Sequence, residues 1–420
     1  MKVLEQALPA LLHFEFYYPL IMAYVWVVGA VLYFVRWEFR VTRGITHRPI
    51  MGEYPPVSFV VPCHNEAANI ESTLRAIAAQ EYPTFEIIAV DDGSSDDTAR
   101  LLKSLQQTYG NLRVITLESN QGKAMALRMG AMVSRYEFLI CIDGDAILDS
   151  RAALWIMTHF VYEARVGAVT GNPRVRNRSS LLGRIQVGEF SSIVGMIKRA
   201  QRIYGRVFTV SGVIAGFRKA ALQDVGYWSL DMVTEDIDIS WKLQINHWDV
   251  RFEPLAFCWI LMPESFKGLW RQRLRWSQGG VEVLLKYFRT ILRWRKRRMW
   301  LVYAEYCASV CWAYGMATVL ALWFLGAWFP LPESLRIEGS LFGWNGMLLG
   351  LTCLVQFAVS LAIDSRYEQG VGRFYYWMIW YPMAYWLLNV LTTVVALPKA
   401  LAKAPGRRAI WESPDRGLEQ

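Results

Sequence analysis

Four long apolar stretches divide the chain, and each could form a membrane-spanning helix. They cover residues 14–35, 301–329, 341–363 and 374–398. A hydrocarbon core of about 30 Å needs roughly 20 apolar residues in a helix. Trp and Tyr gather at the ends of the stretches, as they do at membrane interfaces. The pattern predicts an integral membrane protein whose first stretch is an anchor, since it lacks the small-residue cleavage site of a signal peptide.

Between the first two apolar stretches, short β-rich runs alternate with helical patterns. The runs that read as strands are residues 57–61, 85–90, 113–117 and 138–142. This alternation predicts an α/β domain with a doubly wound, mainly parallel sheet. Tyr54-Pro-Pro56 marks its start, because proline breaks regular structure.

The whole chain can be divided on the same pattern. An N-terminal segment (1–13), the first span (14–35) and a linker (36–55) precede the α/β domain at 56–270. A basic and aromatic helical segment (271–298) follows, then the other three spans and a tail (399–420). Residues 181–204 carry apolar residues at helical spacing with basic residues around them. They predict either an amphipathic helix at the membrane surface or an ordinary half-buried helix.

The 420 residues have a formal net charge of +9, and its distribution argues against nucleic acid as the partner. Basic residues cluster after the first span, at 36–48, and before the second, at 289–298. Such clusters mark the cytoplasmic side of a membrane and bind anionic lipids. We therefore expect the α/β domain to face the cytoplasm. Four spans would leave the tail outside, although its basic residues favour the inside; either that rule fails or the last stretch, interrupted by Pro382, does not simply cross.

Two acidic residues follow the strand at 138–142. Asp143 and Asp145 flank Gly144, which allows a sharp turn at the carboxyl end of the strand. Ligands bind at this edge of open α/β sheets, and carboxylate oxygens suit Mg²⁺ or Mn²⁺ bound to a diphosphate. Taken alone, the motif fits a surface turn equally well.

Other polar residues follow the neighbouring strands. Asn65 and Glu66 come after the first strand and its Pro62, and Asp92 ends the second. A carboxylate such as Asp92 can accept the imide N–H of uracil. Lys123, at the start of a helix, either reaches a phosphate or base or is solvated. There is no Gly-x-Gly-x-x-Gly fingerprint and no phosphate loop, which argues against kinases, NAD-dependent enzymes and ATP-driven transporters.

Three further motifs could lie near the crevice. Ser211 and Gly212 stand in a loop-rich stretch. Thr234 precedes Glu235 and Asp236 at the start of a helix, where the acids either favour the helix dipole or take part in catalysis. Gln272, Arg275 and Trp276 are spaced i, i+3 and i+4, so one helix face offers an amide, a guanidinium and an indole. These groups suit a sugar and a diphosphate.

In their order and spacing, these motifs resemble those of the processive family-2 glycosyltransferases, which include cellulose, chitin and hyaluronan synthases. The similarity is greatest to the bacterial synthases of poly-β-1,6-N-acetyl-D-glucosamine, a polysaccharide of the biofilm matrix. The segments that carry this similarity include residues 171–174, 185–189, 198–204, 208–212, 234–243, 259–264 and 411–417.

The resemblance implies a GT-A fold, UDP-N-acetylglucosamine as the donor and Mg²⁺ or Mn²⁺ as the metal. It also implies export of the growing polysaccharide, a small two-span partner subunit and activation by cyclic di-GMP. The expected location is the bacterial inner membrane, with several spans in contact with lipids.

The resemblance also implies roles for the residues. Asp236 would be the general base, with Glu235 beside it, and Asp145 and Asp143 would hold the metal. Trp276 would stack near the acceptor, whose end Ser211 and Gly212 would line. The residues expected to bind the UDP-sugar are Pro62, Asn65, Glu66, Asp92, Lys123, Asp143, Gly144, Gln272, Arg275 and Trp276.

Two other functions are compatible with parts of the pattern. A non-processive enzyme that transfers one sugar to a polyprenyl phosphate would share Asp92 and the Asp143–Asp145 turn, but would not need the face of Gln272, Arg275 and Trp276. A membrane sensor or scaffold with an inactive transferase domain would not need carboxylates at every motif.

Overall fold

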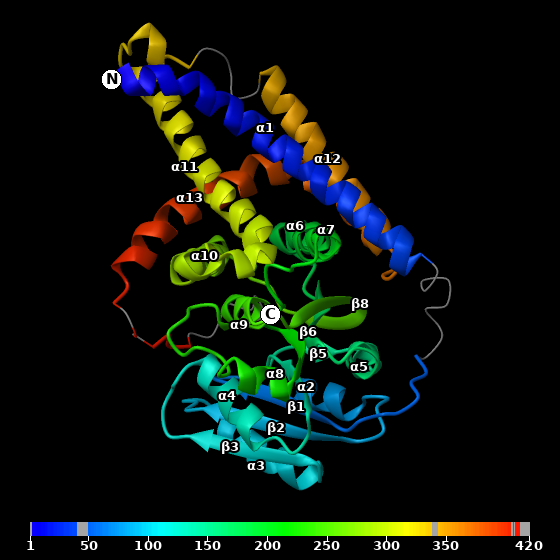
Figure 1. Ribbon diagram of the computed structural model, residues 1–420. Coiled ribbons are helices and arrows are strands. Elements are labelled where there is room, and N and C mark those ends of the chain that lie inside the picture. The colour runs from blue at the N-terminus through cyan, green and yellow to red at the C-terminus, as the bar shows by residue number, and fades with distance from the viewer. Residues whose placement is uncertain (1, 40–48, 338–342, 405, 407, 412–420) are drawn as a thin grey trace.

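The computed structural model describes the chain except for residues 1, 40–48, 338–342, 405, 407 and 412–420. Figure 1 shows a sheet domain at one end, long helices at the other, and shorter helices between them. The described residues include an eight-stranded sheet in the order β3-β2-β1-β4-β7-β6-β8-β5.

The first half of the sheet is parallel. β1 (Val57–Cys63), β2 (Phe85–Asp92), β3 (Leu112–Leu117) and β4 (Phe138–Ile142) run in one direction. Every residue of β1 and β4 is buried, which explains why their sequences are continuously apolar rather than alternating. These are the strands that the sequence predicts, and the mainly parallel α/β fold is confirmed.

The second half of the sheet is mixed. β7 (Ile214–Arg218) runs antiparallel to β4 and to β6 (Val166–Val175). β8 (Asp249–Ile260) is parallel to β6, and the short β5 (Ile147–Leu148) is antiparallel to β8. The helices of this domain are α2 (Ile70–Ala78), α3 (Thr98–Thr108), α4 (Lys123–Val133), α5 (Ala152–Tyr162), α8 (Lys219–Asp224) and α9 (Glu235–Ile245).

Four helices in the described part of the chain are long and apolar enough to cross a membrane, over Leu8–Glu38, Trp294–Trp328, Trp344–Asp364 and Ala384–Ala402. The first consists of α1 (Lys2–Tyr33) and a π-helical turn, η1 (Phe34–Glu38). The second joins a 3₁₀ turn, η4 (Trp294–Met299), to α11 (Trp300–Trp328), and the third is α12 (Trp344–Asp364). The stretch predicted at 374–398 falls on two elements, the 3₁₀ segment η6 (Val371–Trp380) and α13 (Tyr381–Ala402).

A middle layer lies between the sheet and the long helices (Figure 1). It contains α10 (Phe266–Ile291) and a continuous helical segment made of α6 (Leu181–Phe190), the π-helical η3 (Ser191–Met196) and α7 (Ile197–Tyr204). That segment is largely buried, and its Lys198 and Arg199 are only 4% and 1% exposed. The expected half-exposed face is therefore absent, because α1 packs on one side of the segment and the sheet domain lies on the other.

A buried ionic network connects the sheet domain to the long helices. Arg199 lies 2.8 Å from Glu38 and 3.3 Å from Asp364, and Arg174 lies 2.6 Å from the other oxygen of Asp364. The four side chains come from η1, β6, α7 and α12. Breaking one buried pair costs about 3–5 kcal/mol, so the network holds these elements in one arrangement.

The residues just before and just after α13 contact elements that adjoin the sheet domain. Before its first residue, Trp377 of η6 lies under the guanidinium of Arg184 in α6, 4.9 Å from the ring centre. After its last residue, Lys403 lies 2.9 Å from Glu282 of α10 and donates to the Asp231 carbonyl. The start of the tail therefore lies on the same side of the long helices as the sheet domain.

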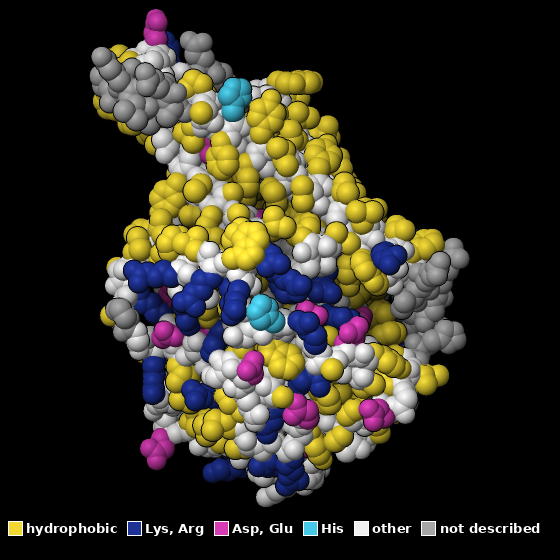
Figure 2. All heavy atoms as spheres, viewed as in Figure 1, with side chains coloured by type: hydrophobic (Ala, Val, Ile, Leu, Met, Phe, Trp, Pro, Cys, Tyr) yellow, Lys and Arg dark blue, Asp and Glu magenta, His cyan; other side chains and the backbone are white. Residues whose placement is uncertain are grey.

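Charge follows the same layers. In Figure 2, apolar side chains cover the long helices, and Lys and Arg form a band where these helices meet the rest of the protein. The exposed basic residues at this level include Arg289, Arg293 and Arg295. A band of this kind matches a surface that meets anionic headgroups.

Candidate active site

The carboxyl ends of β1, β2 and β3 form one edge, where Asp92 organises a loop. Its two carboxylate oxygens accept backbone N–H groups from Gln121 at 2.7 Å and Gly122 at 2.8 Å. The Asp92 carbonyl lies 2.8 Å from Nδ1 of His64, the residue after β1. Burial raises the pKa of Asp92, while the two N–H bonds act in the opposite direction. In this structure Asp92 therefore positions the loop after β3, a role that the sequence analysis missed.

Asn65 and Glu66 connect β1 to the loop after β2. The Asn65 side chain accepts from the backbone of Ser95 at 2.9 Å, and the Asn65 backbone donates to Ser94 at 2.9 Å. Asn65 has a φ of 56°, which asparagine tolerates better than most residues. Glu66 is buried, and its backbone donates to Thr98. Pro62 lies within β1, paired with Val90, so its contribution is to the strand.

The Asp143–Asp145 turn lies against the first loop. A Cβ on Gly144 would come 2.9 Å from Cγ of Glu66 and 3.3 Å from the Pro62 carbonyl, so only glycine fits this approach. The Gly144 carbonyl accepts from Thr73 of α2 at 2.9 Å. Asp145 is 8% exposed. The two carboxylates thus meet the Glu66 loop in a turn that is fixed from two sides.

Lys123 joins three of the predicted motifs. Its ammonium nitrogen lies 2.7 Å from Asp143 and 3.1 Å from Glu235, and it donates to the Gly212 carbonyl at 3.2 Å. Although burial opposes its charge, these two carboxylates raise the pKa of Lys123. The alternative of a solvated lysine is therefore wrong. Lys123 is the cation around which the acids converge.

Asp236 lies across from Lys123 on the first turn of α9. One of its oxygens accepts from the Gly212 backbone at 3.2 Å, and the other from the Ile237 backbone at 2.9 Å. Burial and the neighbouring charge of Glu235 raise the pKa of Asp236 to about 6. For Glu235 burial acts upward, but Lys123 keeps the pKa below its usual value. The pKa values of the two adjacent acids are thus shifted in opposite directions, and that of Asp236 moves toward neutral pH, as suits a general base.

Lys198, on α7, approaches the loop before β7 from the membrane side. Its nitrogen donates to Ser211 at 2.9 Å and to Thr170 at 3.0 Å, and the Ser211 backbone donates to Thr170. Burial lowers the pKa of Lys198 to about 7, against the opposing charge of Asp236. The sequence marked Lys198 only as one of several basic residues in a helical segment. Its position beside Ser211 therefore could not be predicted.

The three residues of the α10 face meet different surroundings. Gln272 is half-buried near Met262, whereas Arg275 is exposed, and its charge adds to the lowering of the Glu235 pKa and opposes the rise of the Asp236 pKa. Trp276 lies under the guanidinium of Arg273, 4.2 Å from the ring centre, and 6.4 Å from the Phe190 ring. This face of α10 thus extends from the acids of α9 to Phe190 of α6.

Thr234 stands at the N-cap position of α9, but its hydroxyl caps no helical N–H. The side chain packs instead on Gly279 of α10, where a Cβ would come 1.9 Å from the Thr234 hydroxyl. This close contact, and not capping, fixes α10 against the turn that carries Glu235 and Asp236.

No group of three or more His, Cys, Asp or Glu side chains in the described residues is arranged to hold a metal by itself. The half-buried Asp143 and the buried Asp145 still fit a magnesium-type ion, because such ions usually take one or two carboxylates and complete their shell with water and substrate phosphates.

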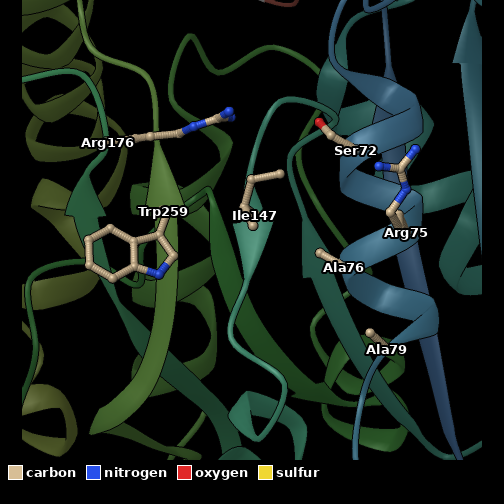
Figure 3. A pocket seen from close by; sticks show the side chains of 7 residues that line it. All are labelled: Ser72, Arg75, Ala76, Ala79, Ile147, Arg176 and Trp259. Atoms are coloured by element: carbon tan, nitrogen blue, oxygen red, sulfur yellow. The ribbon is translucent and has the colours of Figure 1, made fainter.

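The space beside these acids is small, since the pocket lined by Ser211, Gly212, Glu235 and Asp236 has a volume of about 10 Å³. Two larger pockets lie elsewhere in the structure. One, of about 210 Å³, lies between α1, α7 and α11, and Lys198, Phe208 and Thr209 also line it. Figure 3 shows another, of about 480 Å³, in which Arg176 and Trp259 face Ser72 and Arg75 across Ile147. This second pocket contains none of the predicted site residues, so we place the chemistry at the acids.

The chain is similar to known glycosyltransferases in sequence and in fold. A family model described as glycosyltransferase-like family 2 matches residues 55–279. A poly-beta-1,6-N-acetyl-D-glucosamine synthase of Staphylococcus epidermidis is 40% identical over 407 residues, 96% of this chain and 98% of the relative. The synthase of the same name from Staphylococcus aureus strain COL is 39% identical over 408 residues, 97% and 99% of the two chains.

A solved structure shares the fold over nearly the whole chain. It is the mannosyltransferase PcManGT from Pyrobaculum calidifontis in complex with GDP-Man and Mn²⁺, with a TM-score of 0.63 and 19% identity over 95% of this chain and 99% of that one. The predicted GT-A fold is confirmed. The family match and the two synthases then identify this chain as a member of glycosyltransferase-like family 2.

Proposed function

We propose that this chain is an inverting, processive membrane glycosyltransferase. It would polymerise N-acetylglucosamine from UDP-N-acetylglucosamine into β-1,6-linked poly-N-acetylglucosamine and help to export the polymer for the biofilm matrix. The main support is one arrangement: Lys123 contacts both Asp143 and Glu235, and the Gly212 backbone contacts both Lys123 and Asp236. Relatives that align along almost the whole chain carry the name of this synthase.

The donor would lie along the edge formed by the strand ends. The UDP-sugar would meet Asn65, Glu66 and Asp92 at its uridine end, and Lys123 would reach its phosphates after exchanging part of its contact with Asp143. Arg275, which is exposed at the cleft, would bind the diphosphate. Asp143 and Asp145 would hold the metal ion, which supplies positive charge that stabilises the departing diphosphate.

Transfer itself would be a single displacement. The 6-hydroxyl at the non-reducing end of the acceptor would lie near Ser211 and Gly212 and lose its proton to Asp236. The new bond would form between that oxygen and the anomeric carbon while the bond from the same carbon to the diphosphate breaks, releasing UDP. The α-linked donor thus gives a β-linked product. A pKa near 6 leaves Asp236 ionised at neutral pH and able to accept the proton.

The pocket between α1, α7 and α11 supports an exit path for the polymer. It begins at Lys198, which contacts Ser211, and its walls carry both aromatic and polar side chains. Within it, Trp26 donates to the Glu305 carboxylate at 3.0 Å. A hydrated sugar chain needs polar partners inside a membrane. Trp276 would stack on the acceptor at the inner end of this path.

We further propose how the chain lies in the bacterial inner membrane. α1, α11 and α12 would cross it, and α13 would lie along the cytoplasmic surface, since both of its ends contact elements beside the sheet domain. Three crossings place the tail in the cytoplasm, in agreement with its basic residues. A small two-span partner subunit and activation by cyclic di-GMP are implied by the family resemblance alone, and we assign no residues to them.

The experiment that tests this function uses membranes containing the full chain. They are incubated with several radiolabelled UDP-sugars, and any polymer is characterised by linkage-specific digestion. We expect polymer from UDP-N-acetylglucosamine only, with β-1,6 linkages. A single sugar on a polyprenyl phosphate would identify the non-processive alternative, and the absence of UDP release would favour an inactive scaffold.

A further inference from the structure

The C-terminal tail contacts α10 at one point and the carboxyl end of β1 at another. Lys403 contacts Glu282 of α10, and Ala409 donates a backbone hydrogen bond of 3.0 Å to the Leu230 carbonyl, before the α9 turn. Two residues later, Trp411 lies beside His64, at the carboxyl end of β1. The tail thus extends from the membrane side of the domain to the strand ends where the nucleotide is expected.

Asn120 forms a double hydrogen bond with the backbone of Trp411. Its side-chain nitrogen donates to the Trp411 carbonyl at 2.8 Å, and its side-chain oxygen accepts from the Trp411 N–H at 3.3 Å. The same Asn120 nitrogen lies 3.1 Å from Nε2 of His64. A planar amide that pairs with both backbone groups of one residue fixes the backbone from which the indole extends.

Gly122 allows the tail to approach. Its φ is 93°, and a Cβ at this position would come 2.2 Å from the Ala409 carbonyl oxygen. The Gly122 N–H is also one of the two groups that Asp92 holds. Gly122 therefore belongs to the loop that Asp92 organises and also contacts the tail. Any side chain at this position would displace the tail.

The result is an aromatic corner at the nucleotide end of the cleft. The rings of His64 and Trp411 have centroids 5.9 Å apart and planes inclined by 34°. The Asp92 carbonyl and the Asn120 side chain hold the two ring nitrogens of His64. Aromatic rings beside fixed hydrogen-bonding groups are a common means of holding a planar heterocycle.

We propose that Trp411 is a nucleoside-positioning residue, and that the tail completes the wall of the cleft that holds the base of the sugar-nucleotide donor. This inference builds on the proposed function, which names the donor but assigns no role to the tail. It predicts that removing the indole weakens binding through the base and leaves binding through the diphosphate unchanged.

The test measures binding of UDP, CDP, GDP and ADP to the purified full chain in detergent with Mn²⁺, by calorimetry. The variants are Trp411→Ala, Trp411→Phe and a chain truncated after Arg408. Ile410→Ala is the matched control, since Ile410 is the adjacent tail residue and is 69% exposed.

We expect Trp411→Ala and the truncated chain to bind UDP about 3- to 10-fold more weakly, the range of one aromatic contact. Trp411→Phe should recover most of the affinity and Ile410→Ala should equal the wild type. Discrimination between UDP and ADP should decrease only in Trp411→Ala and the truncated chain. Wild-type UDP affinity in these two chains would overturn the inference, and tighter binding would mean that the indole competes with the base.

The design separates this inference from the proposed function. If the wild type makes no polymer from UDP-N-acetylglucosamine, the proposed function fails. The role of Trp411 can still be tested, by comparing how tightly the wild type and Trp411→Ala bind the nucleotide for which the wild type has the highest affinity. If polymer is made and Trp411→Ala binds that nucleotide normally, only the inference about the tail fails.

Discussion

The ammonium nitrogen of Lys123 lies 2.7 Å from the Oδ1 atom of Asp143. The two residues come from the first position of α4 and from the residue after β4, and they meet because α4 begins and β4 ends at the same edge of the sheet. The same nitrogen lies 3.1 Å from Glu235, more than 100 residues further along the chain. One cation thus holds the proposed metal-binding turn and the proposed base within reach of each other.

Replacing Lys123 by Met should reduce the transfer rate by about 100-fold or more, because Asp143 and Glu235 would lose the charge that both contact. The measurement is UDP release from UDP-N-acetylglucosamine. Lys103→Met, at an exposed position of α3, is the control and should be as active as the wild type. An active Lys123→Met variant would show that the convergence at Lys123 is structural only.

Asp236→Asn should bind UDP normally and lose transfer by about 10²- to 10⁴-fold, the usual contribution of a general base. Binding by calorimetry and polymer formation should be measured on the same preparation. Glu71→Gln changes an exposed acid of α2 in the same way and should have no effect. Polymerisation by Asp236→Asn at nearly the wild-type rate would exclude Asp236 as the base.

The pH dependence of kcat/KM should reflect the interaction between Asp236 and Glu235. Burial and Glu235 raise the pKa of Asp236 to about 6, and a base acts only when ionised, so kcat/KM should fall about tenfold for each pH unit below 6. Glu235→Gln removes a negative charge beside Asp236 and should move the midpoint to lower pH. A midpoint that moves upward, or stays, would contradict the proposed coupling.

The metal requirement for transfer should change in variants of Asp145 and stay the same in variants of Asp236. Chelation should abolish transfer, and Mn²⁺ or Mg²⁺ should restore it. We expect Asp145→Asn to raise the Mn²⁺ concentration for half-maximal activity by about 10- to 100-fold, since changes around a metal commonly have effects of this size. The residual activity of Asp236→Asn should keep the wild-type requirement; equal shifts in both variants would argue against Asp145 as a specific ligand.

The proposed membrane arrangement predicts which positions can be labelled from outside the cell. In a chain with Cys311 replaced by Ala, Ser334→Cys should react with an impermeant maleimide on intact cells. Ala404→Cys, just after α13, should react only after permeabilisation, because both ends of α13 contact elements beside the sheet domain. Labelling of Ala404→Cys on intact cells would mean that α13 crosses the membrane.

Much of the architecture was predictable because it depends on local patterns. Short β-rich runs marked β1 to β4, and long apolar stretches marked the helices suited to a membrane. The later strands were not predicted: β6 contains Gly, Pro and Arg, β8 contains Pro and several charged residues, and their pairing depends on segments far away in the chain. For 374–398, hydropathy alone did not reveal the change from η6 to α13.

The candidate site divides in the same way. The acids were found because a carboxylate after a buried strand or at a helix start has a recognisable sequence context. Lys198 and Trp411 were missed as site residues, since nothing around them in the chain indicates that they meet Ser211 and His64. Asp92 was expected to face a ligand, and its two backbone bonds to the next loop became visible only in three dimensions.

By itself, the sequence determined which residues are apolar, where strands and helices form, and which charged groups stand at their ends, because these properties depend on neighbours a few residues away. The tertiary structure alone decided that Lys123 would meet both acids, that α13 would return the tail to the sheet domain, and that Trp411 would lie on His64. Each of these contacts joins residues about 20 to 350 positions apart, and only the packing of whole elements brings such residues together.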